Sequence, residues 1–289
     1  EVLTGPLAQL YGNSAGGVIQ TFTREAGDKP VAESQVYFGS YGMARSDWQF
    51  SQRTGNVGVV ADYSTFAIHG YRDNSDARRQ QLNTVVTVDA KPDTRIKLIA
   101  NIFDMPYAKD ALGLTASQYA TNPAQAGNYA IANGAQKIVK QEQVGVVIDH
   151  KINTELRFQA RLYSGTRDNL QYQASSATAG TWVGLARQFG GAGIQIQGKA
   201  RMSGDKALDW VIGHDRDSSG EQRQGGSTAN GSKTNTNRNE LNVASNRDYF
   251  AQANWHLIPN WTFITGVRQS SVQLSSRDDY LTDGVDGSG

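Results

Sequence analysis

Segment after segment of this chain alternates between apolar and polar side chains with a period of two residues. In 155–163, for example, Phe158 and Leu162 fall on one face, and Arg157 and Arg161 fall on the other. An α-helix, with its period of 3.6 residues, would scatter both kinds around its axis, so the pattern predicts β-strands. Eleven segments are predicted strands: 34–41, 44–53, 57–71, 82–91, 95–105, 142–150, 155–163, 192–202, 207–215, 248–257 and 261–273.

The connections between these segments alternate in length. The short ones are rich in Gly, Pro, Asn and Asp, which favour tight turns. They lie at 53–56, 91–94, 151–154, 203–206 and 258–260, whereas longer polar connections are expected at 106–141, 168–191 and 216–247. Strands of about ten residues with one apolar face, short turns at one end and long loops at the other predict an all-β fold, a transmembrane antiparallel β-barrel. Aromatic residues near strand ends are expected to form interfacial girdles: Trp48, Tyr63, Trp210, Trp255 and Trp261.

Composition narrows the class of protein. Hydrophobic residues make up 38% of the 289, and no apolar run approaches the roughly 18 residues of a membrane-spanning helix. The chain contains no Cys, which excludes disulfides, thiol nucleophiles and iron–sulfur clusters, and its net charge of +1 gives no reason to expect a nucleic-acid partner. A soluble β-sandwich would also alternate, but the Arg-rich polar rows fit a wet lumen better.

Eleven strands would leave two open edges, which lipid does not tolerate. The chain begins at Glu1 with no signal-like segment and ends on a polar stretch, 286–289. We therefore expect an internal piece of a longer protein.

The first thirty residues do not alternate and are rich in Gly. They include Glu1–Pro6, Leu10–Gly12 and Gly16–Gln20. This segment resembles the end of the plug domain of TonB-dependent outer-membrane receptors, which reads approximately EVLRGP, then LYG, then GGVINI. Thr4 stands where the family usually has Arg, and Gln20 stands where it has Asn. A phosphate-binding loop is the rival interpretation, but neither a Gly-Lys-Ser/Thr nor a GxGxxG pattern is present. The matching plug-motif residues are Gly5, Pro6, Tyr11, Gly12, Gly16 and Gly17.

The resemblance implies two regions. Residues 1–32 would be the C-terminal end of a plug domain, and 33–289 the N-terminal half of the receptor barrel, with 11 of roughly 22 strands. Gly39–Gly42 falls where these receptors make their first tight hairpin. The family resides in the outer membrane of Gram-negative bacteria, among lipid and lipopolysaccharide, and we expect a monomer. Its import is energised by the TonB complex of the inner membrane, which would engage a region outside this chain.

The family further implies uptake of a scarce, large ligand, and a ferric siderophore is the commonest one. Short sequence motifs at 69–73, 113–115, 122–126 and 266–272 resemble the branch of the family that contains the enterobacterial receptor for pyrroloquinoline quinone. Pyrroloquinoline quinone is therefore the alternative to a ferric siderophore as ligand. A passive porin, or a surface receptor used by phage, is an alternative of another class.

No catalytic constellation is visible, because the four His are scattered and any pairing with Ser is unconstrained. No acidic spacing matches a calcium loop. We therefore expect a binding and transport protein rather than an enzyme, with no cofactor and no metal. Strand direction places one set of residues near the outer mouth, where they would contact ligand: Arg72, Tyr107, Arg167, Tyr172 and Arg187. A deeper set is expected to pair with carboxylates of the plug: Arg157, Arg161, Lys199 and Arg201.

Overall fold

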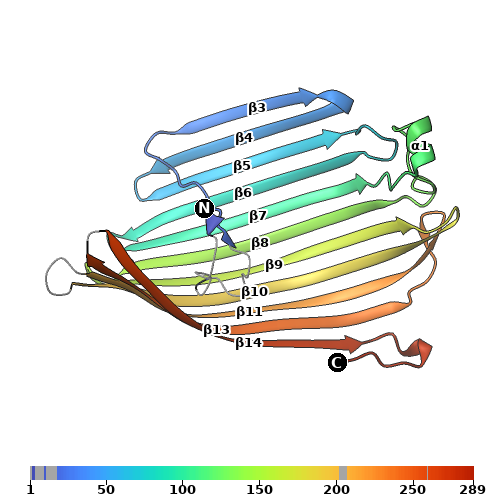
Figure 1. The fold of residues 1–289 in the computed structure, drawn as a ribbon. Coiled ribbons are helices and arrows are strands. Elements are labelled where there is room, and N and C mark those ends of the chain that lie inside the picture. Colours follow the sequence, from blue (N-terminus) through green and yellow to red (C-terminus); the bar gives the residue numbers. More distant parts are fainter. Residues whose placement is uncertain (1, 4–9, 11–17, 202–206, 259) are drawn as a thin grey trace.

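The computed structural model describes residues 2–3, 10, 18–201, 207–258 and 260–289, and its main feature is one curved antiparallel sheet (Figure 1). In this described part each long strand pairs with its neighbours in the sequence, with the first and the last long strand at the two edges, so the order in the sheet follows the sequence. The strands are β3 (Val31–Gly39), β4 (Met43–Thr54), β5 (Val57–Ile68), β6 (Ala77–Lys91), β7 (Thr94–Lys109), β8 (Gln136–Lys151), β9 (Leu156–Ala174), β10 (Ala179–Arg201), β11 (Ala207–Ala229), β13 (Arg238–Ile258) and β14 (Trp261–Asp278).

Smaller elements complete the described chain. The two-residue strand β12 (Ser232–Lys233) pairs with β11, and β1 (Val2–Leu3) pairs with β2 (Val18–Ile19). One short helix, α1 (Ala116–Thr121), begins at a capping box formed by Thr115 and Gln118. No helix in the described residues has the length and apolar character needed to cross a membrane. The predicted all-β class and its eleven strands are thus confirmed.

Two of the three predicted long loops are wrong. Residues 168–191 and 216–247 belong mostly to strands, and the connections shrink to 175–178 and 230–237. Only the third, now 110–135, is a long loop. In 216–229 both faces of the strand are polar, so the period-two pattern disappears although the backbone ladder continues. In 168–174 the alternation persists, with Leu170 and Tyr172 on one face and Gln171 on the other.

The tight turns at 53–56, 91–94 and 151–154 fall where the sequence predicts them, whereas 203–206 and Pro259 of the turn 258–260 lie outside the described residues. Gly55 adopts a positive φ of 57° between β4 and β5. The first hairpin turns at η2 (Ser40–Gly42), where Gly42 has a φ of 67° and a Cβ there would collide with the ring of His69. Glycine is therefore required at this turn for both backbone and space.

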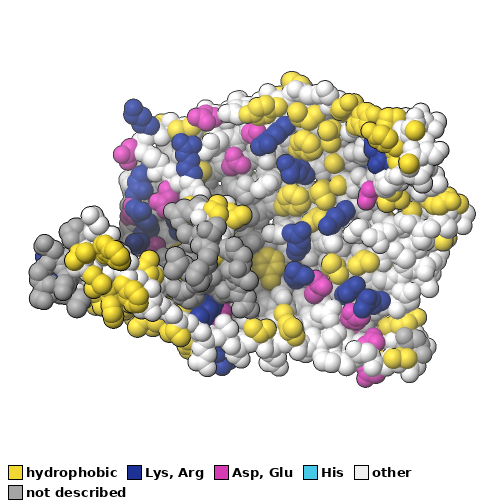
Figure 2. Space-filling model, in the orientation of Figure 1, with side chains coloured by type: hydrophobic (Ala, Val, Ile, Leu, Met, Phe, Trp, Pro, Cys, Tyr) yellow, Lys and Arg dark blue, Asp and Glu magenta, His cyan; other side chains and the backbone are white. Residues whose placement is uncertain are grey.

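The register divides the side chains into two faces, because directly paired residues of antiparallel strands share a face. We call the face that carries Arg95 and Lys97 the inner face and the opposite one the outer face. The N-terminal segment, which contains β1 and β2, lies in front of the inner face in Figure 1. Glu25 of that segment contacts Arg95 and Lys97, which fixes the inner face. Figure 2 shows Lys and Arg side chains gathered over this side of the molecule, with Asp and Glu among them.

The outer face carries exposed apolar side chains on strand after strand. They include Leu98, Val144, Leu162, Ile194, Ile212, Tyr249, Trp255 and Val267. The five aromatic residues predicted for interfacial girdles also occupy outer-face positions. An apolar face left in contact with the surroundings, opposite a charged face, is the side-chain distribution of a membrane barrel wall.

Candidate functional site

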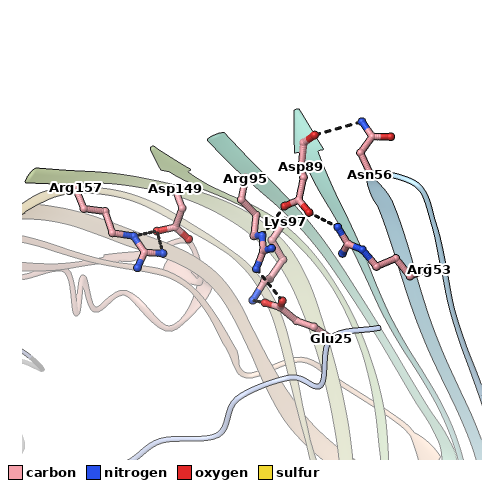
Figure 3. A network of polar contacts seen from close by, with 8 residues as sticks. All are labelled: Glu25, Arg53, Asn56, Asp89, Arg95, Lys97, Asp149 and Arg157. Atoms are coloured by element: carbon pink, nitrogen blue, oxygen red, sulfur yellow. Dashed lines mark hydrogen bonds and ion pairs between the residues drawn. The ribbon is translucent and has the colours of Figure 1, made fainter. Parts of the chain in front are cut away.

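Near the short-turn end, the inner face carries an ion-pair network that ties the N-terminal segment to the wall (Figure 3). Glu25 lies with one carboxylate oxygen 2.5 Å from Lys97 Nζ and the other 3.3 Å from Arg95 Nη1. Arg95 Nε also donates to Asp89 at 2.7 Å, and Asp89 takes a second contact from Arg53. Glu25 thus joins a chain of alternating charges whose other members lie on β4, β6 and β7.

Arg157 and Arg161, which we expect to pair with the plug, both contact carboxylates of the wall. Arg157 Nη2 lies 3.0 Å from Asp149 on β8. Arg161 Nη2 lies 3.0 Å from Asp215, two strands away on β11. Their predicted plug contacts remain predictions, because the plug-motif residues Gly5, Pro6, Tyr11, Gly12, Gly16 and Gly17 lie outside the described residues.

Lys199 and Arg201 are the other two predicted plug contacts. Both side chains are exposed, at the short-turn end of β10. Neither makes an ion pair with a residue that the structure describes. They are therefore open to a partner beyond this part of the chain.

In the middle of the inner face, the carboxylates are engaged by neighbouring strands. Tyr163 donates from its hydroxyl to Asp217 Oδ1 at 2.5 Å. Asp248 lies 2.6 Å from Arg268 Nη2 and accepts from Asn246 Nδ2 at 2.7 Å. Because these carboxylates are used within the wall, they do not form a ready cation site. Within the described residues no group of three or more His, Asp or Glu side chains is arranged to hold a metal ion.

Toward the long-loop end, the structure brings two predicted ligand contacts together. Arg167 on β9 and Arg187 on β10 are direct register partners on the inner face, and both are exposed. Arg187 Nε donates to Glu221 at 2.9 Å, whereas Arg167 Nη1 donates to the amide oxygen of Gln141 at 2.6 Å. With two guanidinium groups and one carboxylate, this row keeps one positive charge for an incoming anion.

The structure does not bring Tyr107 and Tyr172 to this row. Tyr172 is five residues beyond Arg167 on the same strand and therefore points to the outer face. Tyr107 is paired with Arg78 after a bulge between Met105 and Ala108, which also places it in an outer-face row. Their predicted ligand contact thus has no support from the geometry of this wall.

Arg72 lies in the loop between β5 and β6, where it binds backbone rather than an open site. Its guanidinium donates to the carbonyl oxygens of Leu112 at 2.7 Å, Gln125 at 3.0 Å and Ala111 at 3.1 Å. All three acceptors belong to the loop 110–135, so Arg72 holds two neighbouring loops together.

The same loop region contains a second polar link. Asp76 accepts from Lys109 Nζ at 3.1 Å and lies 3.2 Å from His69 Nδ1. The hydrogen bond to His69, followed by that to Lys109, holds the pKa of the Asp76 carboxyl below its ordinary value. This carboxylate is therefore ionised throughout the neutral range and joins the loop to the end of β7.

Sequence reasoning missed several inner-face residues that complete these networks. None of these residues belongs to a motif. Asp89 and Arg95 fall in predicted strands, whereas Glu25 lies in the non-alternating segment and Glu221 in a connection predicted to be a loop. Their partners depend on which strands are neighbours and in which register.

No family model matches the chain. Solved structures do match its fold. The ferric citrate transporter FecA, in its unliganded form, superposes with a TM-score of 0.81 at 16% identity, over 96% of this chain and 43% of that one. BauA, the ferric preacinetobactin receptor from Acinetobacter baumannii, gives a TM-score of 0.79 at 14% identity, over 95% and 46%. The ferric-catecholate import receptor Fiu from E. coli K12, in its open form, gives 0.78 at 13%, over 96% and 50%.

These likenesses establish the architecture: the described sheet has the fold of part of the β-barrel in such receptors. The chain spans about half the length of each structure it matches. These three proteins are named as a transporter or as receptors.

Proposed function

We propose that this chain forms part of the wall of an outer-membrane receptor in a Gram-negative bacterium. The receptor would import a scarce, large ligand with energy supplied through the TonB complex of the inner membrane. In this proposal residues 1–32 are the C-terminal end of a plug domain, and 33–289 are the N-terminal half of the barrel. The protein would act as a monomer surrounded by lipid and lipopolysaccharide.

One observation carries the proposal: a non-alternating N-terminal segment lies against the charged inner face of a wall whose outer face is apolar. Glu25 fastens that segment through Arg95 and Lys97. A passive porin has an open, water-filled lumen and needs no such segment. A segment anchored inside the lumen instead fits a plugged barrel that opens only when work is done on it.

The ligand that we propose is a ferric siderophore. The three matched structures are named for ferric citrate, ferric preacinetobactin and ferric-catecholate import. Anionic ligands of this kind suit Arg167 and Arg187, because guanidinium groups form bidentate, charge-assisted hydrogen bonds with carboxylates. Pyrroloquinoline quinone, also an anion, is the alternative that the same pair would accept.

The test is uptake by the full-length protein in an outer-membrane host that lacks its own receptors. Labelled ferric siderophores and labelled pyrroloquinoline quinone are compared with and without TonB. We expect TonB-dependent uptake of a ferric siderophore; TonB-dependent uptake of pyrroloquinoline quinone alone would replace the proposed ligand. Equal leakage without TonB would indicate a porin, and a chain absent from the membrane fraction would overturn the barrel assignment.

A matched set of variants tests the arginine row. Arg167→Gln and Arg187→Gln each remove one charge-assisted contact, so we expect ligand affinity to fall about tenfold, the equivalent of ~1.4 kcal/mol. Tyr172→Phe is the control, because that side chain lies on the outer face of the same strand. Unchanged binding in both arginine variants would show that the ligand does not contact Arg167 and Arg187.

A further inference from the structure

The outer face of the last four long strands, β10, β11, β13 and β14, carries positively charged side chains and, among the described residues, no negatively charged ones. The inner-face rows of β11, β13 and β14, by contrast, contain Asp209, Asp215, Asp217, Glu221, Glu240, Asp248 and Asp278. Three arginines supply the positive charge of the outer face, and one of them, Arg277, is paired with Asp279 at 2.8 Å.

The other two, Arg216 on β11 and Arg247 on β13, are direct register partners. Both side chains are exposed. Neither makes an ion pair or a side-chain hydrogen bond with any residue that the structure describes. Like charges directly opposite each other destabilise a β-ladder. The pair therefore has a standing electrostatic cost that a bound anion would remove.

The pair borders the main apolar part of its strands; beyond it, on the long-loop side, the large apolar residues in the outer-face rows of β11 and β13 are Val243 and Leu241. Two residues along each strand, toward the short-turn end, His214 stacks on Tyr249 with ring centroids 4.5 Å apart. Beyond this stack follow exposed apolar side chains such as Ile212 and Trp255. In a membrane barrel, aromatic side chains lie at the interface, between apolar side chains that face the hydrocarbon and charged ones at headgroup level. The order of side chains on β11 and β13 is the same.

The distance along the strand fits that interpretation. Leu257 is an exposed apolar outer-face residue at the short-turn end of β13, and Arg247 lies ten residues from it. A rise of about 3.3 Å per residue and a tilt of about 40° give a height of roughly 25 Å. The apolar band of an outer-membrane barrel is also about 25 Å tall. Arg216 and Arg247 would then stand at headgroup level.

We propose that Arg216 and Arg247 together bind the phosphate of an anionic lipid headgroup at the long-loop end of the wall. Two guanidinium forks from adjacent strands supply parallel N–H donors to phosphate oxygens, and the phosphate neutralises their repulsion. The lipid is favoured over free phosphate because its acyl chains cover the exposed apolar side chains below the pair. This inference rests on the proposed membrane location.

The test uses the full-length protein, purified in a neutral detergent and titrated with short-chain phosphatidic acid. Diacylglycerol of the same chain length and inorganic phosphate are the two comparison ligands, and bound lipid is counted by native mass spectrometry. We expect phosphatidic acid to bind wild type at least about tenfold more tightly than it binds the Arg216→Gln/Arg247→Gln variant. Arg277→Gln, which removes an already paired outer-face arginine, should bind like wild type.

A second measurement separates a lipid site from a structural role. In lipid-free detergent the double variant should melt at the same temperature as wild type or higher, because it loses a repulsion. Phosphatidic acid should raise the melting temperature of wild type but not that of the double variant.

Equal binding by all variants would overturn the inference, and so would inorganic phosphate that displaces the lipid at equal concentration. Each of these outcomes leaves the proposed function intact, provided that the protein is found in the outer membrane. A protein missing from that membrane would instead remove the proposed function.

Discussion

Arg161 of β9 and Asp215 of β11 form an ion pair of 3.0 Å that spans the strand between them. The residue they cross is Gly193, which is the register partner of both. A Cβ at this position would collide with Asp215 Oδ1 and Arg161 Nε. The missing side chain of Gly193 thus makes room for a contact between strands that are not neighbours.

We therefore expect Gly193→Ala to break this ion pair. The methyl group overpacks the contact, and the free energy of unfolding should fall by about 1–3 kcal/mol. Denaturant unfolding of the purified full-length protein in detergent measures the change.

Gly220→Ala, on β11, is the matched control. A Cβ there meets nothing within 4 Å. If Gly193→Ala is no more destabilising than this control, the wall accommodates the methyl group and the ion pair is not held by the glycine.

The contact of Glu25 with Arg95 and Lys97 should hold the N-terminal segment against the wall. Glu25→Gln removes the negative charge, so we expect greater motion of residues 20–30. A spin label measures this motion. Because the chain has no Cys, Gly27→Cys introduces one site within it, at a position where an added Cβ meets nothing within 4 Å.

Asp28→Asn is the charge-matched control for that experiment, because Asp28 makes no ion pair with a described residue. High salt should loosen the wild-type label as Glu25→Gln does, since exposed ion pairs are screened. Equal label mobility in Glu25→Gln and wild type would show that other contacts hold the segment.

Arg72 should hold the loop between β5 and β6 against the loop 110–135. Arg72→Lys keeps the charge but loses the fork that reaches three carbonyl oxygens, so we expect local opening of 110–135 to become easier by roughly 1–3 kcal/mol. Hydrogen–deuterium exchange of that loop measures the change. Arg78→Lys, in which an arginine with no side-chain bond to a described residue is exchanged, is the control.

The same substitution tests the sequence-based expectation that Arg72 contacts ligand. If binding weakens while exchange of 110–135 is unchanged, Arg72 acts on ligand directly. If binding weakens and exchange of 110–135 rises as well, the effect of Arg72 on binding is transmitted through the loop.

Asp76 should make part of the stability depend on pH. Its pKa is lowered in the folded state by His69 and Lys109, so its contribution is fully present above the unfolded pKa of about 3.9. The contribution is lost as the pH falls through the lowered folded value. We expect the melting temperature of wild type to exceed that of Asp76→Asn near pH 7, and the difference to shrink below about pH 4.

Asp279 gives the comparison, because Arg277 lowers the pKa of its carboxyl next to β14, the strand at the opposite edge of the sheet. The difference in melting temperature between wild type and Asp279→Asn should also shrink at low pH. This variant should leave hydrogen–deuterium exchange of the loop that contains Asp76 unchanged. A constant difference between wild type and Asp76→Asn across this range would contradict the linkage.

The sequence by itself determined the class of fold. Side chains such as Phe158 and Arg157 alternate because successive residues of a strand point to opposite faces, and this local rule needs no knowledge of neighbours. The eleven strands, most of their turns and the contrast between an apolar and a charged face follow from it. The sequence placed Arg167 and Arg187 near the outer mouth, but that they share one face depends on the register of β9 and β10.

Only the tertiary structure decided how far the strands extend and which side chains meet. In 216–229 both faces are polar, so this segment looks like a loop although it continues the ladder. The bulge before Ala108 places Tyr107 in an outer-face row, and the continued strand does the same for Tyr172. The reach of Arg161 to Asp215 depends on the register of three strands at once. Pairings of this kind join residues far apart in the chain, and no local period encodes them.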